Sequence, residues 1–415
     1  MRKRTPFHSC IARYNETEIW KNWSGYLVAP NLQYSIATEY YAIRNAVSLL
    51  DTSPLFKYRF SGTDAIELLS RAMVRDVRKC PPGRAQYTVW CDEDGFVVQD
   101  GVLLRIQPNE FLLTAGEPAL RWFRQIARQF NLNENTVEDV SENYGILAVQ
   151  GPHANSVLNQ LMSAVDSLSY FTVTESTIAN CPVVVSRTGY TGDLGYEIWV
   201  TAAQGEKVFE ELMKAGAGFN ITPIGTTALK MSRVEAGLLL MDVDFYSSRY
   251  AWSPAQKDTP YELGFDWMLK GLSNDNREFT GRSAIEKELA EKRSRWTTVG
   301  LSIDIKEYEK RFHDAGVIPD KQNVYRETTS SLYLRGKREW EYAGYVSSFL
   351  YSSLLKRPIA IGKLPPALAE PGTEVDMEIQ VIRKPETVLA TVQKLPFFNP
   401  KRKTESFSSQ EKSNA

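Results

Sequence analysis

The sequence predicts an α+β protein of two related halves followed by a small β-barrel. Strand-like and helix-like segments follow one another in the order strand, helix, strand, strand, helix over residues 56–130, and a similar order returns over residues 144–240. From about Trp296 onward the segments are mostly strands separated by Pro/Gly turns, which is typical of a small barrel. No short internal repeat is visible, which argues against a solenoid or a propeller.

The first half begins with an alternating strand, "FKYRFSG", and a helix in which Ile66, Leu69 and Met73 recur at helical spacing. The stretch "GRAQYTVWCDEDGFVVQDGVLLRI" predicts two strands joined at the Asp-Gly turn of "DEDG". A further strand at "EFLLTAGE" and a helix with an exposed basic face at "EPALRWFRQIARQF" complete this half.

The second half starts with a strand and a turn at "YGILAVQGP" and a helix at "HANSVLNQLM". The stretch "PVVVSRTGYTGDLGYEIWV" predicts a hairpin whose turn lies near "TGD", and helices follow at "GEKVFEELMKAG" and "TTALKMSRVEAGLLL". The expected barrel strands are "TTVGLSID", "EYAGYVSSF", "EVDMEIQVI" and "TVLATVQKLPF".

Composition excludes several classes of function. The chain of 415 residues has 49 basic and 50 acidic side chains, so it has no overall field that would attract nucleic acid or an anionic membrane. Four widely spaced cysteines and three histidines do not predict a metal site. We expect the cysteines to be reduced, structural thiols. No signal-peptide core and no membrane-length apolar run is visible, so we expect a cytoplasmic location.

Asp100, in "GFVVQDGVLLRI", is a candidate site residue. It lies in the middle of an apolar strand pattern, where a carboxylate is costly unless it is paired or used, and Gly101 beside it allows a close approach of ligand or backbone. The alternative is an aspartate at a strand edge beside a bulge. The pattern alone leaves the two interpretations open.

The glycine-rich stretch "SRTGYTGDLGYEIWV" does not fit a phosphate loop. It lacks the Lys-Ser/Thr pair of a Walker loop, and its glycines do not lie between a strand and a helix. It leads into a strand with Tyr196, Ile198 and Val200 on one face and Glu197 and Trp199 on the other. On this pattern Glu197 is an exposed hairpin glutamate or the edge of a binding site.

Other charged residues have weaker patterns. Arg233 and Glu235 lie two apart on a helix and do not share a face, so surface or capping charges are the alternative to a site. His153 follows "QGP" and can simply begin a helix, and three scattered histidines do not support a catalytic triad.

Five stretches, in order over roughly residues 35–400, resemble the glycine-cleavage T-protein family of tetrahydrofolate-dependent aminomethyltransferases. They are "AIRNAVSLLDTS", "LAVQGPHA", "SRTGYTGDLGYEI", "SRVEAGLLL" and the segment from "PYELGFDWMLK" to "REFTGRSAI". The resemblance implies a three-domain cloverleaf around a central folate pocket. We expect α+β halves over residues 1–140 and 141–290, the barrel over 291–398 and a polar, disordered tail over 399–415.

The resemblance also implies roles for individual residues. Asp100 matches the catalytic aspartate beside the folate nitrogen that accepts the carbon unit, and Glu197 matches the glutamate that hydrogen-bonds the pterin. Tyr87 and Tyr190 would wall the pocket, and Arg233 would also bind the cofactor. The expected cofactor is tetrahydrofolate, with no metal.

The sequence departs from the family pattern at four positions near the expected donor side. Pro54 replaces a histidine of the family, and Gln99 replaces the first acid of its Asp pair. Thr114 replaces an asparagine, and Leu229 replaces an arginine. These changes surround the place where a donor carried by a lipoyl protein would arrive. The stretches "QDGVLL" and "RNAVSLLD" resemble relatives that demethylate a small donor, which is the alternative to a reaction with a lipoyl carrier protein.

Two tyrosines are candidates for contacting the donor. Tyr246 and Tyr250, in "DFYSSRYAW", could polarise its leaving heteroatom, and packing aromatics are the alternative. A methyl or aminomethyl transferase is the function that the resemblance implies. A non-catalytic folate-binding protein of the same fold is the alternative: Asp100 favours the enzyme, and Leu229 and Thr114 favour altered chemistry or the non-enzyme.

Overall fold

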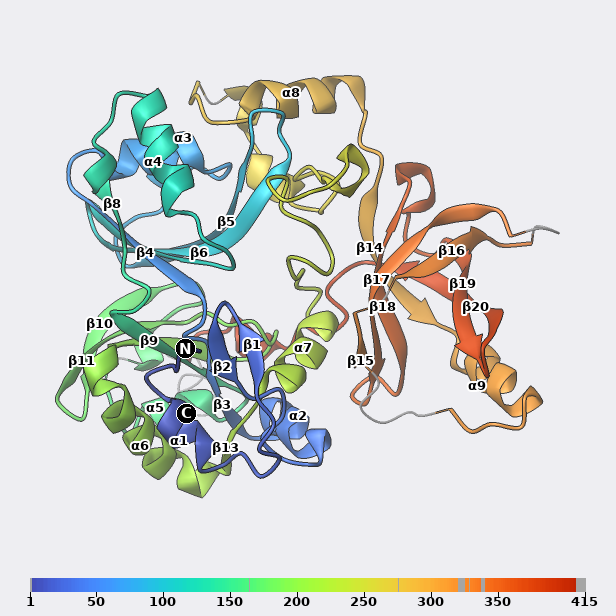
Figure 1. Ribbon diagram of the computed structural model, residues 1–415, viewed down its shortest axis with the longest axis horizontal. Coiled ribbons are helices and arrows are strands. Elements are labelled where there is room, and N and C mark those ends of the chain that lie inside the picture. The colour runs from blue at the N-terminus through green and yellow to red at the C-terminus, as the bar shows by residue number, and fades with distance from the viewer. Residues whose placement is uncertain are drawn as a thin grey trace, which may run out of the picture.

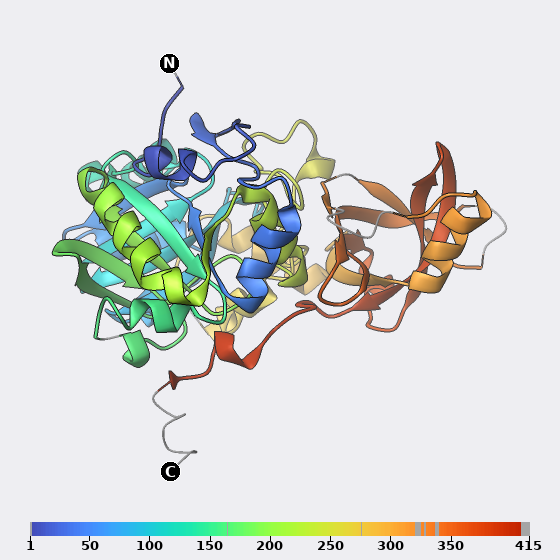
Figure 2. The same cartoon turned by 90° about the horizontal axis from the view of Figure 1, so that it is seen from below.

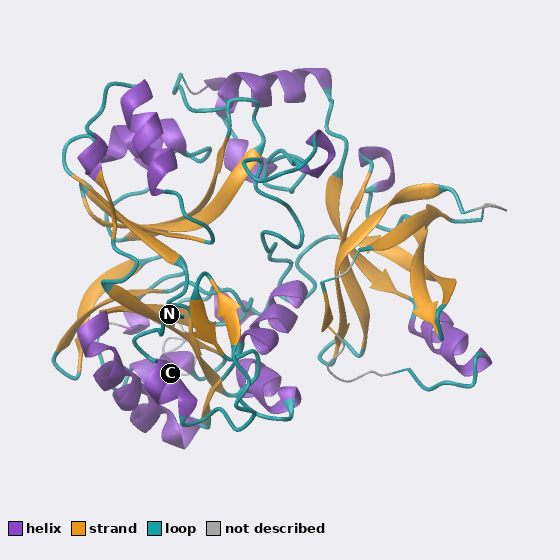
Figure 3. Cartoon of the chain, viewed as in Figure 1, coloured by secondary structure: helices purple, strands orange, loops and turns teal. Residues whose placement is uncertain are grey.

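Three groups of strands organise the chain, as the computed structural model shows (Figure 1). The structure describes residues 2–163, 165–274, 276–319, 325–327, 329–336 and 340–407. Two open sheets with their helices lie on one side of the molecule, and the barrel lies on the other (Figure 3). The α+β class and the C-terminal barrel predicted from the sequence are confirmed.

The first sheet has six strands in the order β10-β11-β12-β9-β3-β13, with one parallel pair between β3 and β13. Helices α1, α5 and α6 share a core with one face of this sheet, which includes Leu147, Val185 and Ile198. The strands are β3 (Val47–Asp51), β9 (Tyr144–Gln150), β10 (Val173–Ile178), β11 (Cys181–Ser186), β12 (Gly195–Thr201) and β13 (Ile221–Pro223). The helices are α1 (His8–Ala12), α5 (Ala154–Leu158) and α6 (Gly205–Gly216).

Two further helices and a short hairpin belong to the same unit. α2 (Ile36–Asn45) and α7 (Thr226–Glu235) contact each other, and α7 also contacts the barrel. The hairpin consists of β1 (Lys21–Trp23) and β2 (Tyr26–Val28).

The second sheet has five strands in the order β5-β6-β7-β4-β8. Aromatic side chains fill the core between it and its helices, because Tyr58, Phe60 and Trp90 pack around Phe123 of α4. Its elements are β4 (Phe56–Ser61), β5 (Arg84–Cys91), β6 (Val97–Gln107), β7 (Glu110–Ala115), β8 (Val137–Asp139), α3 (Ala65–Ala72) and α4 (Leu120–Gln129).

The two units are interleaved along the chain, so the predicted division at residues 140 and 290 does not follow the sheets. β3 lies in the predicted first half but pairs with β9 and β13. Conversely, Arg277 donates to the carbonyls of Ser70, Met73 and Val74. A segment that comes late in the sequence therefore packs on the five-stranded unit. α8 (Arg282–Glu291) packs there too, against Gly95.

The barrel closes through six strands in the order β17-β16-β19-β20-β14-β18, with β18 pairing back to β17. β15 adds to β17 at its outer edge, and α9 packs on β20. The elements are β14 (Thr297–Ile303), α9 (Ile305–Asp314), β15 (Tyr325–Arg326), β16 (Ser330–Leu334), β17 (Tyr342–Ser352), β18 (Arg357–Leu364), β19 (Glu374–Val381) and β20 (Lys384–Gln393).

After the barrel the chain runs back to the sheets (Figure 2). The predicted disordered tail begins at residue 399, yet residues 399–407 have defined contacts and include the 3-10 turn η10 (Lys401–Lys403). Arg402 pairs with the buried Asp193, which explains why this polar stretch is held. The rest of the predicted tail, residues 408–415, lies outside the described residues.

Candidate functional site

A cavity of about 1730 Å³ lies where the two sheets and the barrel meet. Both sheets, α7 and the segment that follows the barrel all contribute to its wall. Deep ligand sites occur preferentially at such junctions between domains. The cavity is therefore the candidate functional site.

The sheets place two carboxylates on facing inner surfaces. Leu104 of β6 and Trp199 of β12 belong to one small core between the sheets. Because side chains alternate along a strand, Asp100 shares the face of Leu104, and Glu197 shares the face of Trp199. Both carboxylates line the cavity where this core ends.

Asp100 pairs with Val89 of β5, close to a register shift in that pairing, and the pairing of β6 with β7 begins only at Leu103. The Tyr87 hydroxyl donates a hydrogen bond to Asp100 Oδ2 at 2.8 Å. Burial raises the pKa of Asp100, and the bond from Tyr87 opposes that rise. Gly101 is required beside it, because a Cβ there would meet the Thr114 carbonyl oxygen at 2.2 Å. The strand-edge alternative describes the local pairing of Asp100, and the same carboxylate also lines the cavity.

Glu197 lies between β11 and β9, opposite Ser186 and Ala148. The hydroxyl of Thr188 donates to Oε2, and within the described part of the chain no group hydrogen-bonds Oε1. Burial raises the pKa of Glu197, with the Thr188 bond opposing it. The hairpin glutamate is thus turned into the cavity rather than toward open solvent.

Tyr87 and Tyr190 form part of the cavity wall. The Tyr87 ring meets the ring of Phe265 edge to face, with centroids 5.7 Å apart. The Tyr190 hydroxyl donates to the Leu239 carbonyl, which ties the glycine-rich stretch to the segment after α7. Burial raises the pKa of both phenols well above the usual value, so both remain proton donors.

The glycines of "SRTGYTGDLGYE" make room for neighbours within the protein. A Cβ on Gly189 or Gly195 would meet the amide of Gln150 at 2.0 or 2.2 Å. Gly192 has φ +74° and faces the Ala236 side chain. These glycines shape the loop that carries Tyr190.

Arg233 is absent from the cavity wall, so its role in cofactor binding stays a prediction. Its fully buried guanidinium pairs with Asp244 and donates to Ser348 Oγ at 2.7 Å and to Tyr325 Oη at 3.1 Å. These partners come from the chain after α7 and from the barrel. Arg233 therefore joins α7 to the barrel, and the surface-charge alternative is wrong.

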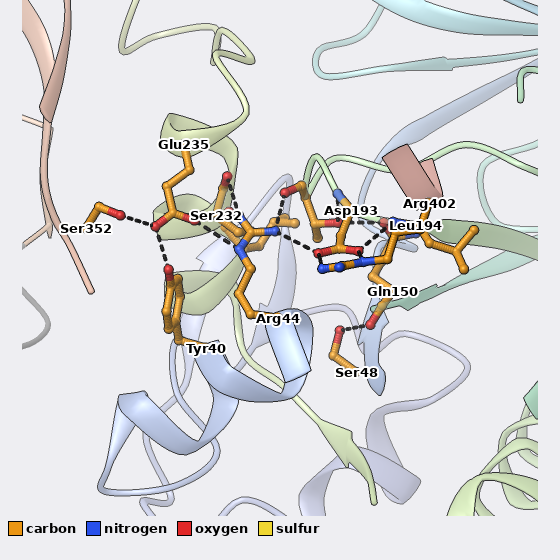
Figure 4. A network of polar contacts seen from close by, with 12 residues as sticks. Tyr40, Arg44, Ser48, Gln150, Asp193, Leu194, Ser232, Glu235, Ser352 and Arg402 are labelled. Atoms are coloured by element: carbon orange, nitrogen blue, oxygen red, sulfur yellow. Dashed lines mark hydrogen bonds and ion pairs between the residues drawn. The ribbon is translucent and has the colours of Figure 1, made fainter. Parts of the chain in front are cut away.

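Glu235 is also buried rather than exposed, at the centre of a polar network (Figure 4). Arg44 of α2 donates to its carboxylate at 2.6 and 2.9 Å, and the hydroxyls of Tyr40 and Ser352 donate to the other oxygen. Arg44 also lies 3.5 Å from Asp193, which links the glycine-rich loop to the same network.

Tyr246 and Tyr250 are not brought to the cavity. They are 43% and 54% exposed and are absent from its wall, so the structure does not support their predicted contact with a donor. His153 precedes α5 and lies 5.7 Å from the ring of Phe219, also away from the cavity.

Three of the four departures from the family pattern lie at or near the cavity. Leu229 lines it beside Lys230, whose ammonium pairs with Glu327 at 2.7 Å. Thr114 also lines it. The buried side chain of Gln99 holds the backbone of Glu117, with contacts of 3.1 and 3.2 Å. Leu229 and Thr114 are therefore part of the wall, and Gln99 supports the wall residue Glu117.

Six cationic residues of the wall were missed from the sequence: Lys21, Arg75, Arg84, Lys230, Lys394 and Lys403. Lys230 adjoins Leu229 in "TTALKMSR", and helical periodicity around Leu229 could have placed it near the wall. Lys403 lies in a polar C-terminal stretch whose composition carries no such signal.

Metal and membrane features complete the description. Among the residues that the structure describes, no group of three or more His, Cys, Asp or Glu side chains could hold a metal ion. In the same described ranges, no helix combines the length and the apolar composition needed to cross a membrane.

Comparisons with known proteins match nearly the whole chain. Residues 8–271 match the GCVT N-terminal domain, and residues 298–399 match the glycine cleavage T-protein C-terminal barrel domain. The chain is 30% identical over 391 residues to the heme-dependent oxidative N-demethylase gamma subunit of Ectopseudomonas mendocina (strain ymp), which covers 92% of this chain and 93% of that protein.

Two further comparisons agree. The chain is 29% identical over 406 residues to the aminomethyltransferase of Bacillus subtilis (strain 168), covering 96% and 99% of the two chains. The fold matches the glycine cleavage system aminomethyltransferase T of Bartonella henselae with a TM-score of 0.77 at 21% identity, over 96% and 99% of the two chains. The chain belongs to the glycine-cleavage T-protein (GCVT) family.

Proposed function

We propose that the protein is a tetrahydrofolate-dependent transferase that moves a methyl or aminomethyl group from a small donor to tetrahydrofolate. The observation that carries the proposal is the placement of Asp100 and Glu197 in one cavity, each without a cation partner among the described residues. Two half-buried carboxylates without cations are costly unless a ligand uses them.

The residues present fit a folate. Glu197 Oε1 is free to accept from N–H donors, as an aminopyrimidine edge would require. Tyr87 and Tyr190 offer aromatic surface beside the two carboxylates. The cavity of about 1730 Å³ has room for a folate and a second, small molecule.

Tetrahydrofolate would supply the nitrogen that accepts the one-carbon unit. Asp100 would lie beside the reacting atoms, where an ionised carboxylate stabilises positive charge that develops during transfer. The Tyr87 hydroxyl orients that carboxylate through its 2.8 Å bond and favours its ionised form. Glu197 would orient the ligand, because orientation lowers the entropic part of the barrier.

A small donor fits the wall near Thr114 and Leu229, which line the cavity where the family has other side chains. One relative is named as the gamma subunit of an oxidative N-demethylase, and others are named aminomethyltransferases. These names support an N-linked one-carbon unit as the group transferred. The gamma-subunit name also supports a role beside partner subunits.

Ligand binding and turnover test the proposal separately. Tetrahydrofolate is expected to raise the melting temperature by an amount set by its concentration relative to its Kd. Methylated and aminomethylated amines are then screened for formation of methyl- or methylene-tetrahydrofolate. Absence of any melting shift at saturating tetrahydrofolate would overturn the proposal.

Asp100→Asn separates catalysis from binding. The variant is expected to bind tetrahydrofolate and to lose at least about 100-fold in turnover, the scale of one electrostatic group in an active site. Asp94→Asn is the matched control, because Asp94 is exposed in the turn of the same β5–β6 hairpin. Equal turnover of both variants would remove Asp100 from the chemistry.

A further inference from the structure

The chain beyond the barrel forms a strap across the glycine-rich unit. We define the strap as residues 396–407; the family match ends within it, at residue 399. Arg402 donates two hydrogen bonds, of 2.7 and 2.8 Å, to the buried carboxylate of Asp193 (Figure 4). Asp193 follows Gly192 in the loop that carries Tyr190.

Arg187 hydrogen-bonds the backbone of the strap. Its fully buried guanidinium donates to the carbonyl oxygens of Arg402, Lys403 and Glu405 at 3.1, 3.3 and 2.7 Å. The ring of Phe407 lies 5.1 Å from that guanidinium. The backbone on both sides of Lys403 is therefore fixed, and the direction of its side chain follows.

Lys403 lines the central cavity. Its ammonium lies 5.6 Å from the centre of the Tyr170 ring, and no carboxylate within the described residues forms an ion pair with it. Burial lowers the pKa of Lys403, and attraction to Asp193 opposes that change. A half-buried cation on a cavity wall without an acid partner is costly in the absence of a ligand.

Arg84 lies near the same part of the wall. It begins β5, forms a bridge with Thr172 two residues from Tyr170, and lines the cavity. Within the described part of the chain it has no acid partner either. Tyr170 and Phe171, which line the cavity as well, connect it to Lys403.

We propose that Lys403, with Arg84, binds a carboxylate of the ligand, and that the Arg402–Asp193 ion pair positions Lys403. The inference rests on the proposed function, because that function supplies two ligands that can carry a carboxylate. One is the glutamate of tetrahydrofolate, and the other is the carboxylate of an amino-acid donor. Lys403 would thus be a binding residue that lies beyond the family match.

Lys403→Gln tests the binding role, with exposed Lys401→Gln of the same turn as the control. In the folate arm, Kd is measured for tetrahydrofolate and for tetrahydropteroate, which lacks the glutamate. If the glutamate is bound, Lys403→Gln raises the Kd for tetrahydrofolate about tenfold, as expected for one charge-assisted contact. The Kd for tetrahydropteroate stays unchanged.

In the donor arm, Kd is measured for N-methylglycine and for dimethylamine at saturating tetrahydrofolate. If the donor carboxylate is bound, Lys403→Gln raises the Kd for N-methylglycine and leaves the Kd for dimethylamine unchanged. Lys403→Arg keeps the charge and is expected to restore most of the affinity lost in either arm.

Failure of the inference and failure of the proposed function have different results. Wild-type binding of both tetrahydrofolate and N-methylglycine by Lys403→Gln overturns the inference alone. Absence of tetrahydrofolate binding by the unmodified protein overturns the proposed function, and the inference with it.

Arg402→Gln tests the positioning role. It is expected to lower the affinity for the same carboxylate-bearing ligand. In the double variant it should add little to the loss of affinity caused by Lys403→Gln, because both residues act on one contact. Arg402→Lys is expected to restore part of the affinity. Additive losses in the double variant would overturn the positioning role of Arg402.

Discussion

Tyr87 and Asp100, on the neighbouring strands β5 and β6, share a hydrogen bond of 2.8 Å in which the phenol donates to the carboxylate. Burial raises the pKa of each group, and the shared bond favours the ionised aspartate. The pair therefore holds a carboxylate in a cavity that disfavours charge. The Tyr87 hydroxyl and a backbone hydrogen bond both oppose the rise in the pKa of Asp100 that burial causes.

Tyr87→Phe is expected to shift the pH dependence of turnover. Loss of the donated bond raises the pKa of Asp100 further, so the fraction of ionised carboxylate at a given pH falls. The acidic limb of kcat against pH should move to higher pH, with a smaller loss at the plateau. Tyr144→Phe, which removes a hydroxyl outside the cavity wall, should leave the limb in place. An unmoved limb in Tyr87→Phe would separate Tyr87 from the titration of Asp100.

Glu197→Gln is expected to stabilise the ligand-free protein at high pH. The pKa of Glu197 in the folded chain is raised above its ordinary 4.5, so the folded state holds the proton to a higher pH than the unfolded state. Wild-type stability therefore falls as pH rises from about 4.5 through the folded pKa, and glutamine removes that loss. The variant should melt above wild type at pH 8, and the difference should shrink toward pH 4.

The same variant should bind tetrahydrofolate more weakly, because a neutral amide replaces a charged acceptor. Glu138→Gln, on the exposed β8, is the control and should change neither property. A variant that melts below wild type at pH 8, with unchanged folate affinity, would contradict both expectations.

Local patterns were enough to predict the elements and the two carboxylates. Alternation along "GYEIWV" put Glu197 opposite the core face, and the apolar run around Asp100 made a carboxylate conspicuous there. The structure brings both to one cavity because two sheets pack by the faces on which these residues lie. Strand periodicity reports a face directly, so this part of the prediction followed from the sequence.

Contacts distant in sequence account for the differences. The pairing of β3 with β9 joins segments about a hundred residues apart, and no local pattern reports such a pairing. The surface-charge interpretation of Arg233 failed for a similar reason, since its partner Ser348 lies in the barrel. The strap was missed because one ion pair and the hydrogen bonds from Arg187 hold it, and its composition resembles that of a disordered tail.

Arg233→Met is expected to destabilise the protein without changing the affinity of the folded fraction for tetrahydrofolate. It would leave Asp244 buried without its cation, a loss of about 3–5 kcal/mol in the free energy of unfolding. Chemical denaturation measures it, and Arg233→Met with Asp244→Leu should recover part of the loss. A tenfold fall in folate affinity at unchanged stability would instead return Arg233 to the binding site.

Gly192→Ala is expected to disturb both stability and binding. Gly192 has φ +74°, and a Cβ there would meet the Cβ of Ala236 at 2.3 Å. The left-handed backbone alone costs about 1–2 kcal/mol for alanine, and the clash adds to it. Tyr190 lies two residues away and Asp193 follows directly, so the cavity wall and the anchor of the strap should shift together.

Gly218→Ala is the matched control for this loop. Gly218 has open space around its Cβ position and no positive φ, so alanine there should be neutral or stabilise by up to about 1 kcal/mol. Hydrogen exchange over residues 188–195 should rise in Gly192→Ala and stay unchanged in Gly218→Ala. Because the loop connects Tyr190 to the strap through Asp193, tetrahydrofolate should bind more weakly in the first variant only. Equal affinity in both variants, with exchange raised in Gly192→Ala, would show that the loop can loosen without disturbing the cavity.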